Sequence, residues 1–123
     1  MTGMFAKHSG LTGLAQRFPV TQLPTGAMLA KQTVKVGSVR YRRCVAISVG
    51  ERGLYLGVHP PLLVKGDMLI PWEEIKEARK TRLYSRRAVR LSIGDPEFGS
   101  VTLYEGLYEQ VAPHLRPDIS HPL

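Results

Sequence analysis

Apolar and polar residues alternate more regularly along residues 39–49 than anywhere else in the chain. Five apolar residues share one parity: Val39, Tyr41, Val45, Ile47 and Val49. The residues of the other parity are charged or small: Arg40, Arg42, Cys44, Ala46 and Ser48. Because successive side chains of a β-strand point to opposite faces, this pattern predicts a half-buried strand.

Shorter apolar runs predict further strands on both sides of this one. A strand over 27–36 ends at Gly37-Ser38, and a hairpin turn at 50–53 leads into a strand with an inner face of Leu54, Leu56 and Val58. His59-Pro60-Pro61 ends that strand, because proline cannot donate a hydrogen bond to a sheet. Residues 62–66 are predicted as a loop or edge segment. The remaining predicted strands cover 68–71, 75–84, 89–93 and 101–103, with a turn at Asp95-Pro96 before the last.

Two segments show helical spacing instead. Leu11, Leu14, Ala15 and Phe18 lie on one face of a short N-terminal helix, which Pro19 ends. This helix could lie on a membrane, but with few basic neighbours and no tryptophan it is expected to pack on its own domain. Near the C-terminus a second helix is predicted, and Pro113 kinks or stops it. Its apolar positions are Leu107, Tyr108, Val111, Ala112 and Leu115.

The length and composition indicate one domain over residues 1–123, with 1–26 as an N-terminal helix and loop packed on it. Of the 123 residues, 43% are apolar, enough for a core without metals or disulfides. Cys44 is the only cysteine, so no intrachain disulfide can form. No apolar run approaches the roughly 20 residues of a membrane span. We therefore expect a cytoplasmic protein.

About seven short strands followed by one amphipathic helix predict a mainly β fold, a small barrel or sandwich plugged by the C-terminal helix. Two stretches strengthen this, the sequence GLYL at 53–56 and the sequence LIPWEEI at 69–75. Together they resemble the pattern of small bacterial pleckstrin-homology-like domains. The order of strands and helix follows that resemblance over about residues 27–115. The resemblance implies a barrel closed by a terminal helix and says little about function.

The residues of this motif also have physical roles of their own. Gly53 is expected to take the positive φ of a tight hairpin. Pro71 fits an edge strand or a strand end, and Glu73-Glu74 suit the first turn of a short helix. Trp72, the only tryptophan, is predicted to anchor the core together with Ile75, with a surface ligand platform as the alternative.

Candidate chemistry is sparse. The histidines His8, His59, His114 and His121 are far apart and show no metal-ligand spacing. Cys44 lies among arginines that could lower the pKa of its thiol, but its simpler role is to fill space in a strand. The glycine pairs lack the context of a phosphate loop. We therefore expect no enzymatic activity, no metal and no cofactor.

The charge distribution is more informative. The net charge is +7, and residues 1–60 contribute all of it, with eight basic residues against Glu51. Residues 79–90 add six basic residues and no acidic one. Such a field favours anionic partners, although a basic surface that only maintains solubility would look the same.

Two clusters could form an anion site. Lys31 and the tripeptide Arg40-Tyr41-Arg42 resemble the basic spacing by which some pleckstrin-homology domains hold phosphoinositides, although Arg43-Cys44 departs from that pattern. Arg82, Tyr84 and Arg86 share a parity suited to nucleic acid if no turn intervenes, but a turn at Ser85-Arg86 would make them a charged hairpin tip. The candidate anion-binding residues are Lys31, Arg40, Arg42, Arg82 and Arg86.

The sequence thus predicts a non-enzymatic binding or scaffolding module, monomeric or weakly self-associating, with a protein partner. The alternative is an anion-binding module for lipid headgroups or nucleic acid.

Overall fold

In the computed structural model of this chain, residues 17–18, 28–58 and 68–119 are described. Seven strands follow in chain order: β1 (Met28–Val36), β2 (Val39–Val49), β3 (Gly53–Val58), β4 (Met68–Pro71), β5 (Ile75–Leu83), β6 (Arg86–Ile93) and β7 (Gly99–Tyr104). The 3-10 turn η1 (Trp72–Glu74) joins β4 to β5, and the helix α3 (Glu105–Val111) runs into the 3-10 turn η2 (Ala112–His114). No helix in these ranges is long and apolar enough to cross a membrane.

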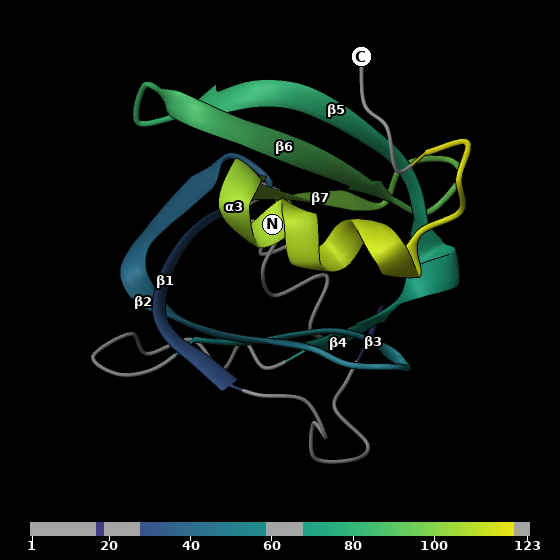
Figure 1. The fold of residues 1–123 in the computed structure, drawn as a ribbon, viewed down its shortest axis with the longest axis horizontal. Coiled ribbons are helices and arrows are strands. Elements are labelled where there is room, and N and C mark those ends of the chain that lie inside the picture. Colours follow the sequence, from purple (N-terminus) through teal and green to yellow (C-terminus); the bar gives the residue numbers. More distant parts are fainter. Residues whose placement is uncertain (1–16, 19–27, 59–67, 120–123) are drawn as a thin grey trace, which may run out of the picture.

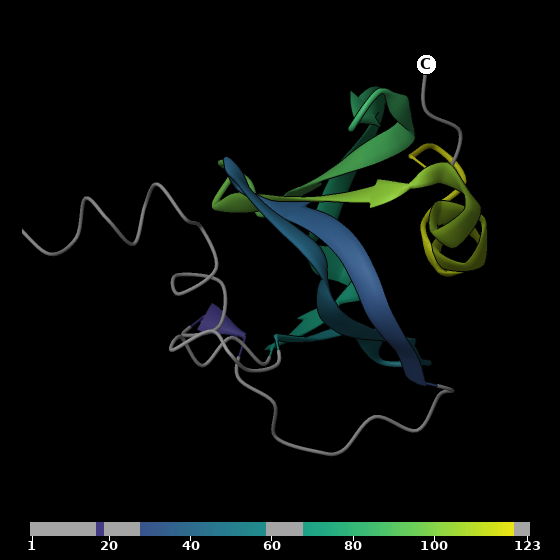
Figure 2. The same ribbon diagram turned by 90° about the vertical axis from the view of Figure 1, so that its left-hand side faces the viewer.

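The strands form one antiparallel sheet in the order β4-β3-β2-β1-β7-β6-β5. The sheet curls into a half-barrel, with β3 and β4 on one side and β5 and β6 on the other (Figure 1). The same ribbon turned by 90° shows α3 beside the curled sheet, at one open end of the half-barrel (Figure 2). The mainly β class and the C-terminal helix are therefore confirmed.

Most of the predicted strands agree closely with the observed ones, whereas the predictions over 89–93 and 101–103 cover only part of β6 and β7. The predictions over 39–49 and 68–71 match β2 and β4, and those over 27–36 and 75–84 differ from β1 and β5 by one residue each. α3 ends at Val111, two residues before Pro113, as predicted. Of the predicted N-terminal helix only Arg17 and Phe18 are described, and residues 59–67 also lie outside the described ranges.

The core fills the inside of the half-barrel. Apolar side chains from every strand and from α3 join one buried cluster, which includes Val36, Ile47, Leu56, Ile70, Ile75, Leu91, Leu103, Leu107 and Val111. Burial of each such side chain stabilises the fold by about 1.5–3 kcal/mol. The curl of the sheet and the position of α3 are therefore set by this shared core.

Trp72 closes one corner of this core. Its side chain is 9% exposed, and its indole N–H donates a hydrogen bond of 2.8 Å to the carbonyl of Gly50. The ring also stacks on His114, with the two centroids 4.7 Å apart. Trp72 thus connects the β2–β3 turn with η1 and η2, which confirms the predicted packing anchor.

Two predictions about β2 and β3 need correction. The alternation places Ala46 and Ser48 on the open face, yet they are 3% and 0% exposed, so the second half of β2 is buried on both faces. Gly53 does not have a positive φ; the positive-φ glycines among the described residues are Gly37 and Gly94. A side chain is excluded at Gly53 because β4 passes so closely that a Cβ would collide with the carbonyl of Ile70.

We expect Gly53→Ala to destabilise the protein by about 2 kcal/mol or more, because the added methyl must push β4 away from β3. The matched control is Gly106→Ala in α3, where a Cβ meets no atom within 4 Å. That change should stabilise the protein by about 0.5–1 kcal/mol through helix propensity. Urea unfolding measures both, and equal effects of the two substitutions would contradict the close approach.

Candidate anion-binding cleft

Two irregularities in the pairing of β1 with β2 set the geometry of the site. Between the pairs Leu29↔Ile47 and Gln32↔Val45, two residues of β1 (30–31) lie opposite one of β2. Between Gln32↔Val45 and Val34↔Tyr41, three residues of β2 (42–44) lie opposite one of β1. Such bulges re-aim side chains locally.

Each bulge contains a basic residue with left-handed backbone. Lys31 has a φ of 54° and Arg43 a φ of 56°. The backbone N–H of Arg43 has left the regular ladder and donates a hydrogen bond of 3.0 Å to Oγ1 of Thr33. In a regular strand, Arg43 would lie on the apolar face of β2 between Tyr41 and Val45. The bulge takes Arg43 off that face.

A strained turn faces these bulges from the other half of the sheet. Tyr84 and Ser85 form the two-residue turn between β5 and β6, and their φ values are 51° and 65°. Positive φ at both central residues is the geometry that suits the twist of a two-residue hairpin. The turn thus lies one residue before the predicted Ser85-Arg86. Arg82, Tyr84 and Arg86 consequently do not share one strand face.

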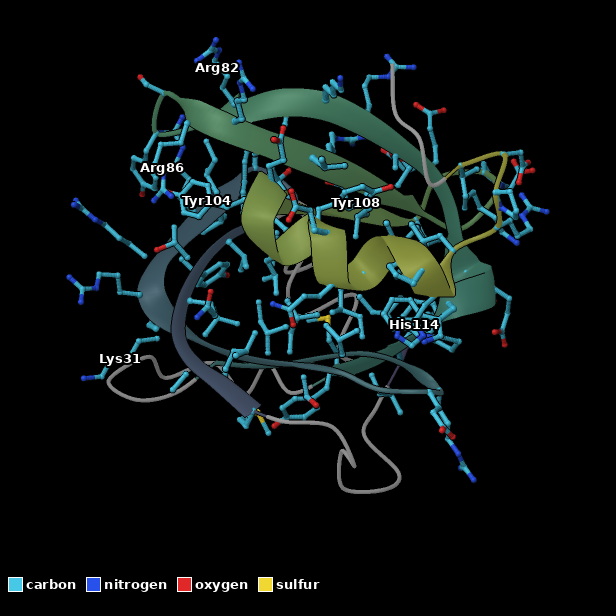
Figure 3. The ribbon with its side chains drawn as sticks, in the orientation of Figure 1. Lys31, Arg82, Arg86, Tyr104, Tyr108 and His114 are labelled. Atoms are coloured by element: carbon cyan, nitrogen blue, oxygen red, sulfur yellow. The ribbon has the colours of Figure 1, made fainter. Side chains whose placement is uncertain are left out.

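Arginine–tyrosine contacts join the two halves at this point. The guanidinium groups of Arg40 and Arg42 lie 5.2 and 5.5 Å from the ring centroid of Tyr84. The guanidinium of Arg86 lies 4.2 Å from the ring centroid of Tyr104, and the two side chains are side by side in Figure 3. Each exposed contact of this kind contributes about 0.5–1 kcal/mol. They hold long basic side chains in preferred positions.

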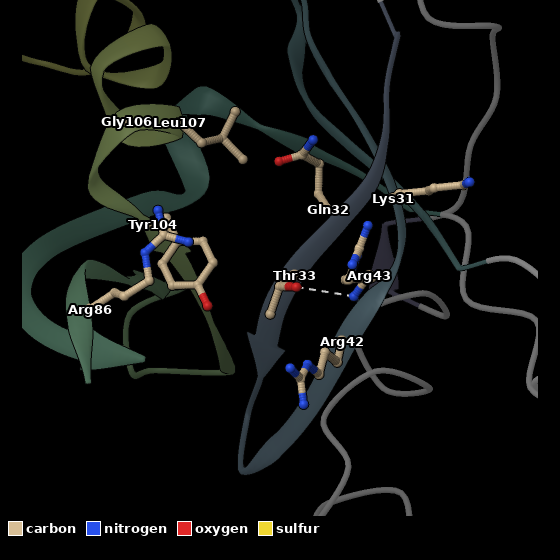
Figure 4. Close-up of a pocket in the computed structure, with 9 residues that line it drawn as sticks. All are labelled: Lys31, Gln32, Thr33, Arg42, Arg43, Arg86, Tyr104, Gly106 and Leu107. Carbon is tan, nitrogen blue, oxygen red and sulfur yellow. Dashed lines mark hydrogen bonds between the residues drawn. The ribbon is translucent and has the colours of Figure 1, made fainter. Parts of the chain in front are cut away.

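The bulges, the start of β6 and the start of α3 surround an open depression of about 510 Å³. We call it the basic cleft, after its four basic residues Lys31, Arg42, Arg43 and Arg86. Gln32, Thr33, Tyr104, Gly106 and Leu107 complete the lining. Figure 4 shows Arg86 and Tyr104 on one wall and Thr33, Arg42 and Arg43 on the other, whereas Lys31 extends away from Arg86 at the rim.

The charge of the basic cleft is not neutralised by the described residues. No acidic residue lines it, and the ion pairs of the described ranges are Arg79–Glu77, Arg90–Glu97 and Arg116–Asp118. Arg90 belongs to the same basic stretch but donates two hydrogen bonds, of 2.9 and 3.0 Å, to Glu97. These bonds lower the pKa of Glu97 below its ordinary value. Arg90 is therefore neutralised by Glu97, whereas none of these ion pairs includes an arginine of the cleft.

The structure gathers most of the predicted anion-binding residues. Lys31, Arg42 and Arg86 line the basic cleft. Arg40 does not line it, but its guanidinium contacts the same tyrosine ring, Tyr84, as that of Arg42. Arg82 is separate: its Nη1 donates a hydrogen bond of 3.0 Å to the carbonyl of Ser85, and it lines another depression.

Sequence reasoning missed six of the nine lining residues, among them Thr33, Arg43 and Tyr104. In the sequence, Arg43 departs from the basic spacing of the resemblance. Arg43 is also a charged residue at a position where the alternation over 39–49 requires an apolar one. Such a break in the alternation indicates a bulge. Thr33 and Tyr104 had no such signal, because they enter the cleft only through the pairing of distant strands.

Backbone strain is concentrated at this end of the molecule. Among the described residues, the non-glycine residues with positive φ are Lys31, Arg43, Tyr84 and Ser85. Two of them line the basic cleft, and the turn formed by the other two contacts Arg40 and Arg42. Sparsely populated backbone conformations cost about 1–3 kcal/mol each and cluster at binding sites.

The neighbouring Cys44 does not have an activated thiol. The sequence suggested that nearby arginines could lower its pKa, but burial raises the pKa of Cys44 above its ordinary value. The same desolvation raises the pKa of Tyr41, which is 9% exposed as its parity predicted. Within the described ranges no three His, Cys, Asp or Glu residues lie close enough to hold a metal ion.

Comparisons with protein-family models, with curated proteins and with solved structures find no match to this chain.

We expect Ser85→Gly to stabilise the protein by about 0.5–1 kcal/mol, because glycine relieves the left-handed strain but loses more chain entropy on folding. Ser38→Gly is the control, since Ser38 lies in the β1–β2 turn without a positive φ. It should give no gain. Thermal unfolding of both variants is the measurement, and a gain from Ser38→Gly alone would contradict the assignment.

Alkylation of Cys44 by iodoacetamide should show a pH midpoint above that of a short cysteine peptide measured in parallel. The thiolate is the reacting form, and burial disfavours it at Cys44. The rate against pH gives the midpoint directly. A midpoint below that of the peptide would mean that the arginines, and not burial, control this thiol.

Proposed function

We propose that this protein is a non-enzymatic, pleckstrin-homology-like binding module that holds an anionic ligand in the basic cleft. Seven antiparallel strands followed by one C-terminal helix support the architectural part, because this is the arrangement that the sequence motif at 53–75 implies. The binding part depends on the cleft itself.

One observation carries the proposal: guanidinium groups from both halves of the sheet converge on one depression that no acidic residue lines. Arg42 and Arg43 come from β2 and Arg86 comes from β6. A guanidinium presents a planar fork of donors that matches the oxygens of phosphate or carboxylate. Facing walls of such groups can contact one anionic group from two directions.

Shape and order at the site support the same conclusion. A volume of about 510 Å³ lies within the range of clefts that take small ligands. Tyr104 holds Arg86, and Tyr84 holds Arg42. Side chains that are already ordered lose less entropy when a ligand binds.

The ligand chemistry is a phosphate-like anion, which a lipid headgroup or a nucleic acid can supply. The lipid is favoured, because the aromatic rings at the cleft already contact arginines, which competes with base stacking. Arg40 and Arg42 already contact the ring of Tyr84, and Arg86 contacts that of Tyr104.

We expect the double variant Arg42→Gln/Arg86→Gln to bind anionic phospholipid vesicles at least about tenfold more weakly than the wild type, since each basic residue near such a surface contributes about 1 kcal/mol. The control is Lys76→Gln/Arg116→Gln, which removes the same charge far from the cleft and should change binding by less than about threefold. Co-sedimentation over a salt series measures both, and binding should weaken as salt rises.

Equal losses in the two double variants would reject the cleft in favour of general surface charge. Failure of the wild type to bind anionic vesicles and single-stranded RNA at low salt would reject an anion-binding function altogether. If the wild type binds RNA but not vesicles, and the cleft variant loses RNA binding, then the basic cleft is the binding site and its ligand is a nucleic acid and not a lipid.

A further inference from the structure

A second surface, independent of the basic cleft, lies along the outer edge of β5. β5 is the last strand in the sheet order, and its outer side pairs with no strand in the described part of the chain. Nine residues, Ile75–Leu83, form this edge. An unpaired edge presents backbone donors and acceptors to another chain.

The β5–β6 turn determines which backbone groups face outward. Its two residues are flanked by the pair Leu83↔Arg86, which therefore exchanges both of its hydrogen bonds. In an antiparallel ladder such pairs alternate with non-bonded pairs, so the next ladder positions of β5 are 81 and 79. The N–H and C=O groups of Ala78, Lys80 and Arg82 consequently point to the outer edge.

Within the described part of the chain, no backbone partner is found for these outward groups. None of the backbone hydrogen bonds found outside the strand ladders and helices of the described residues involves Ala78, Lys80 or Arg82. No register shift occurs from Glu77 to Leu83. Three donors and three acceptors therefore lie in regular spacing along a segment of edge that has no bulge.

The side chains along this edge carry mainly positive charge. Lys76, Arg79, Lys80 and Arg82 are exposed, and the only acidic residue of β5, Glu77, is paired with Arg79 at 2.8 Å. A depression of about 680 Å³ lies over the β5–β6 hairpin beside the start of α3. Its lining residues are Lys80, Thr81, Arg82, Arg87, Ala88 and Glu105.

We propose that the outer edge of β5 accepts an extended, acidic segment of a partner protein as an eighth strand. Backbone hydrogen bonds to Ala78, Lys80 and Arg82 would supply the pairing, and the basic side chains would select acidic residues in the partner. This interaction is additional to the anionic ligand of the basic cleft.

Charge decides between the possible occupants of this edge. A second copy of β5 would place basic side chains opposite basic side chains, which is unfavourable between paired strands. The segments of this chain outside the described ranges contain a single acidic residue, Asp67. These segments therefore cannot supply an acid-rich strand, and charge complementarity favours an acidic segment of a partner protein.

The probe is a synthetic peptide of alternating glutamate and valine residues, with lysine in place of glutamate as its control. We expect the acidic peptide to bind, to slow hydrogen exchange at the amides of Ala78, Lys80 and Arg82, and to bind at least about tenfold more tightly than the lysine peptide. Protection of these three amides already in the free protein would mean that the edge is covered, and would overturn the proposal.

The variant Lys80→Pro tests the backbone role directly. Proline is tolerated where an edge N–H faces outward, so the variant should fold and yet lose peptide affinity by about tenfold. Lys80→Ala is the control for the lost charge and should lose less. Thr81→Pro removes an N–H from the ladder and should instead reduce stability, as seen in urea unfolding.

A peptide N-methylated at alternate residues keeps the proposal testable even if Lys80→Pro fails to fold, because it removes donors without changing the protein. Two such peptides are compared, one methylated at its odd residues and one at its even residues. Unchanged affinity for both of them, or equal affinity for the lysine peptide, would overturn the proposal. The cleft variant Arg42→Gln/Arg86→Gln should retain peptide binding within about threefold, so that failure of one site is distinguishable from failure of the other.

Discussion

The pairing of β1 with β7 is the contact that makes this chain one sheet. It consists of only two residue pairs, Lys35↔Thr102 and Val36↔Val101, extended by a hydrogen bond of 2.9 Å from the N–H of Gly37 to the carbonyl of Ser100. β1 to β4 lie on one side of this junction and β5 to β7 on the other. Val36 and Val101 are both fully buried, so the apolar core reinforces a short ladder.

The same junction creates the basic cleft. Thr33, Arg42 and Arg43 belong to the strands before it, and Arg86 and Tyr104 belong to the strands after it. The cleft would not exist in either half alone, because each half supplies one wall. A binding site across such a junction also links ligand binding to the stability of the whole fold, since only the assembled sheet presents both walls.

The two proposed surfaces differ in what they recognise. The basic cleft presents side-chain cations on strained backbone, which suits a compact anion held from several directions. The edge of β5 presents regular backbone groups on an unstrained strand, which suits an extended peptide. The β5–β6 hairpin belongs to both, because its turn touches Arg40 and Arg42 while its outer strand forms the edge.

The sequence by itself determined the local structure, because strand alternation, turns and helix ends depend on near neighbours. The alternation over 39–49 located β2, Pro113 located the end of α3, and the motif around Trp72 predicted the anchor at the corner of the core. Three of the five candidate anion-binding residues line the cleft for a related reason: charge and spacing can be read along a strand.

Only the tertiary structure decided the rest. The close approach of β4 explains Gly53, and the bulges place Lys31 at the rim and Arg43 in the wall of the cleft. Strand register decides which residues lie near Arg86 and Tyr104 across the junction. It also decides which backbone groups of β5 point to the outer edge. Register and strand order depend on hydrogen bonds and packing between residues far apart in the chain, and no pattern of near neighbours records them.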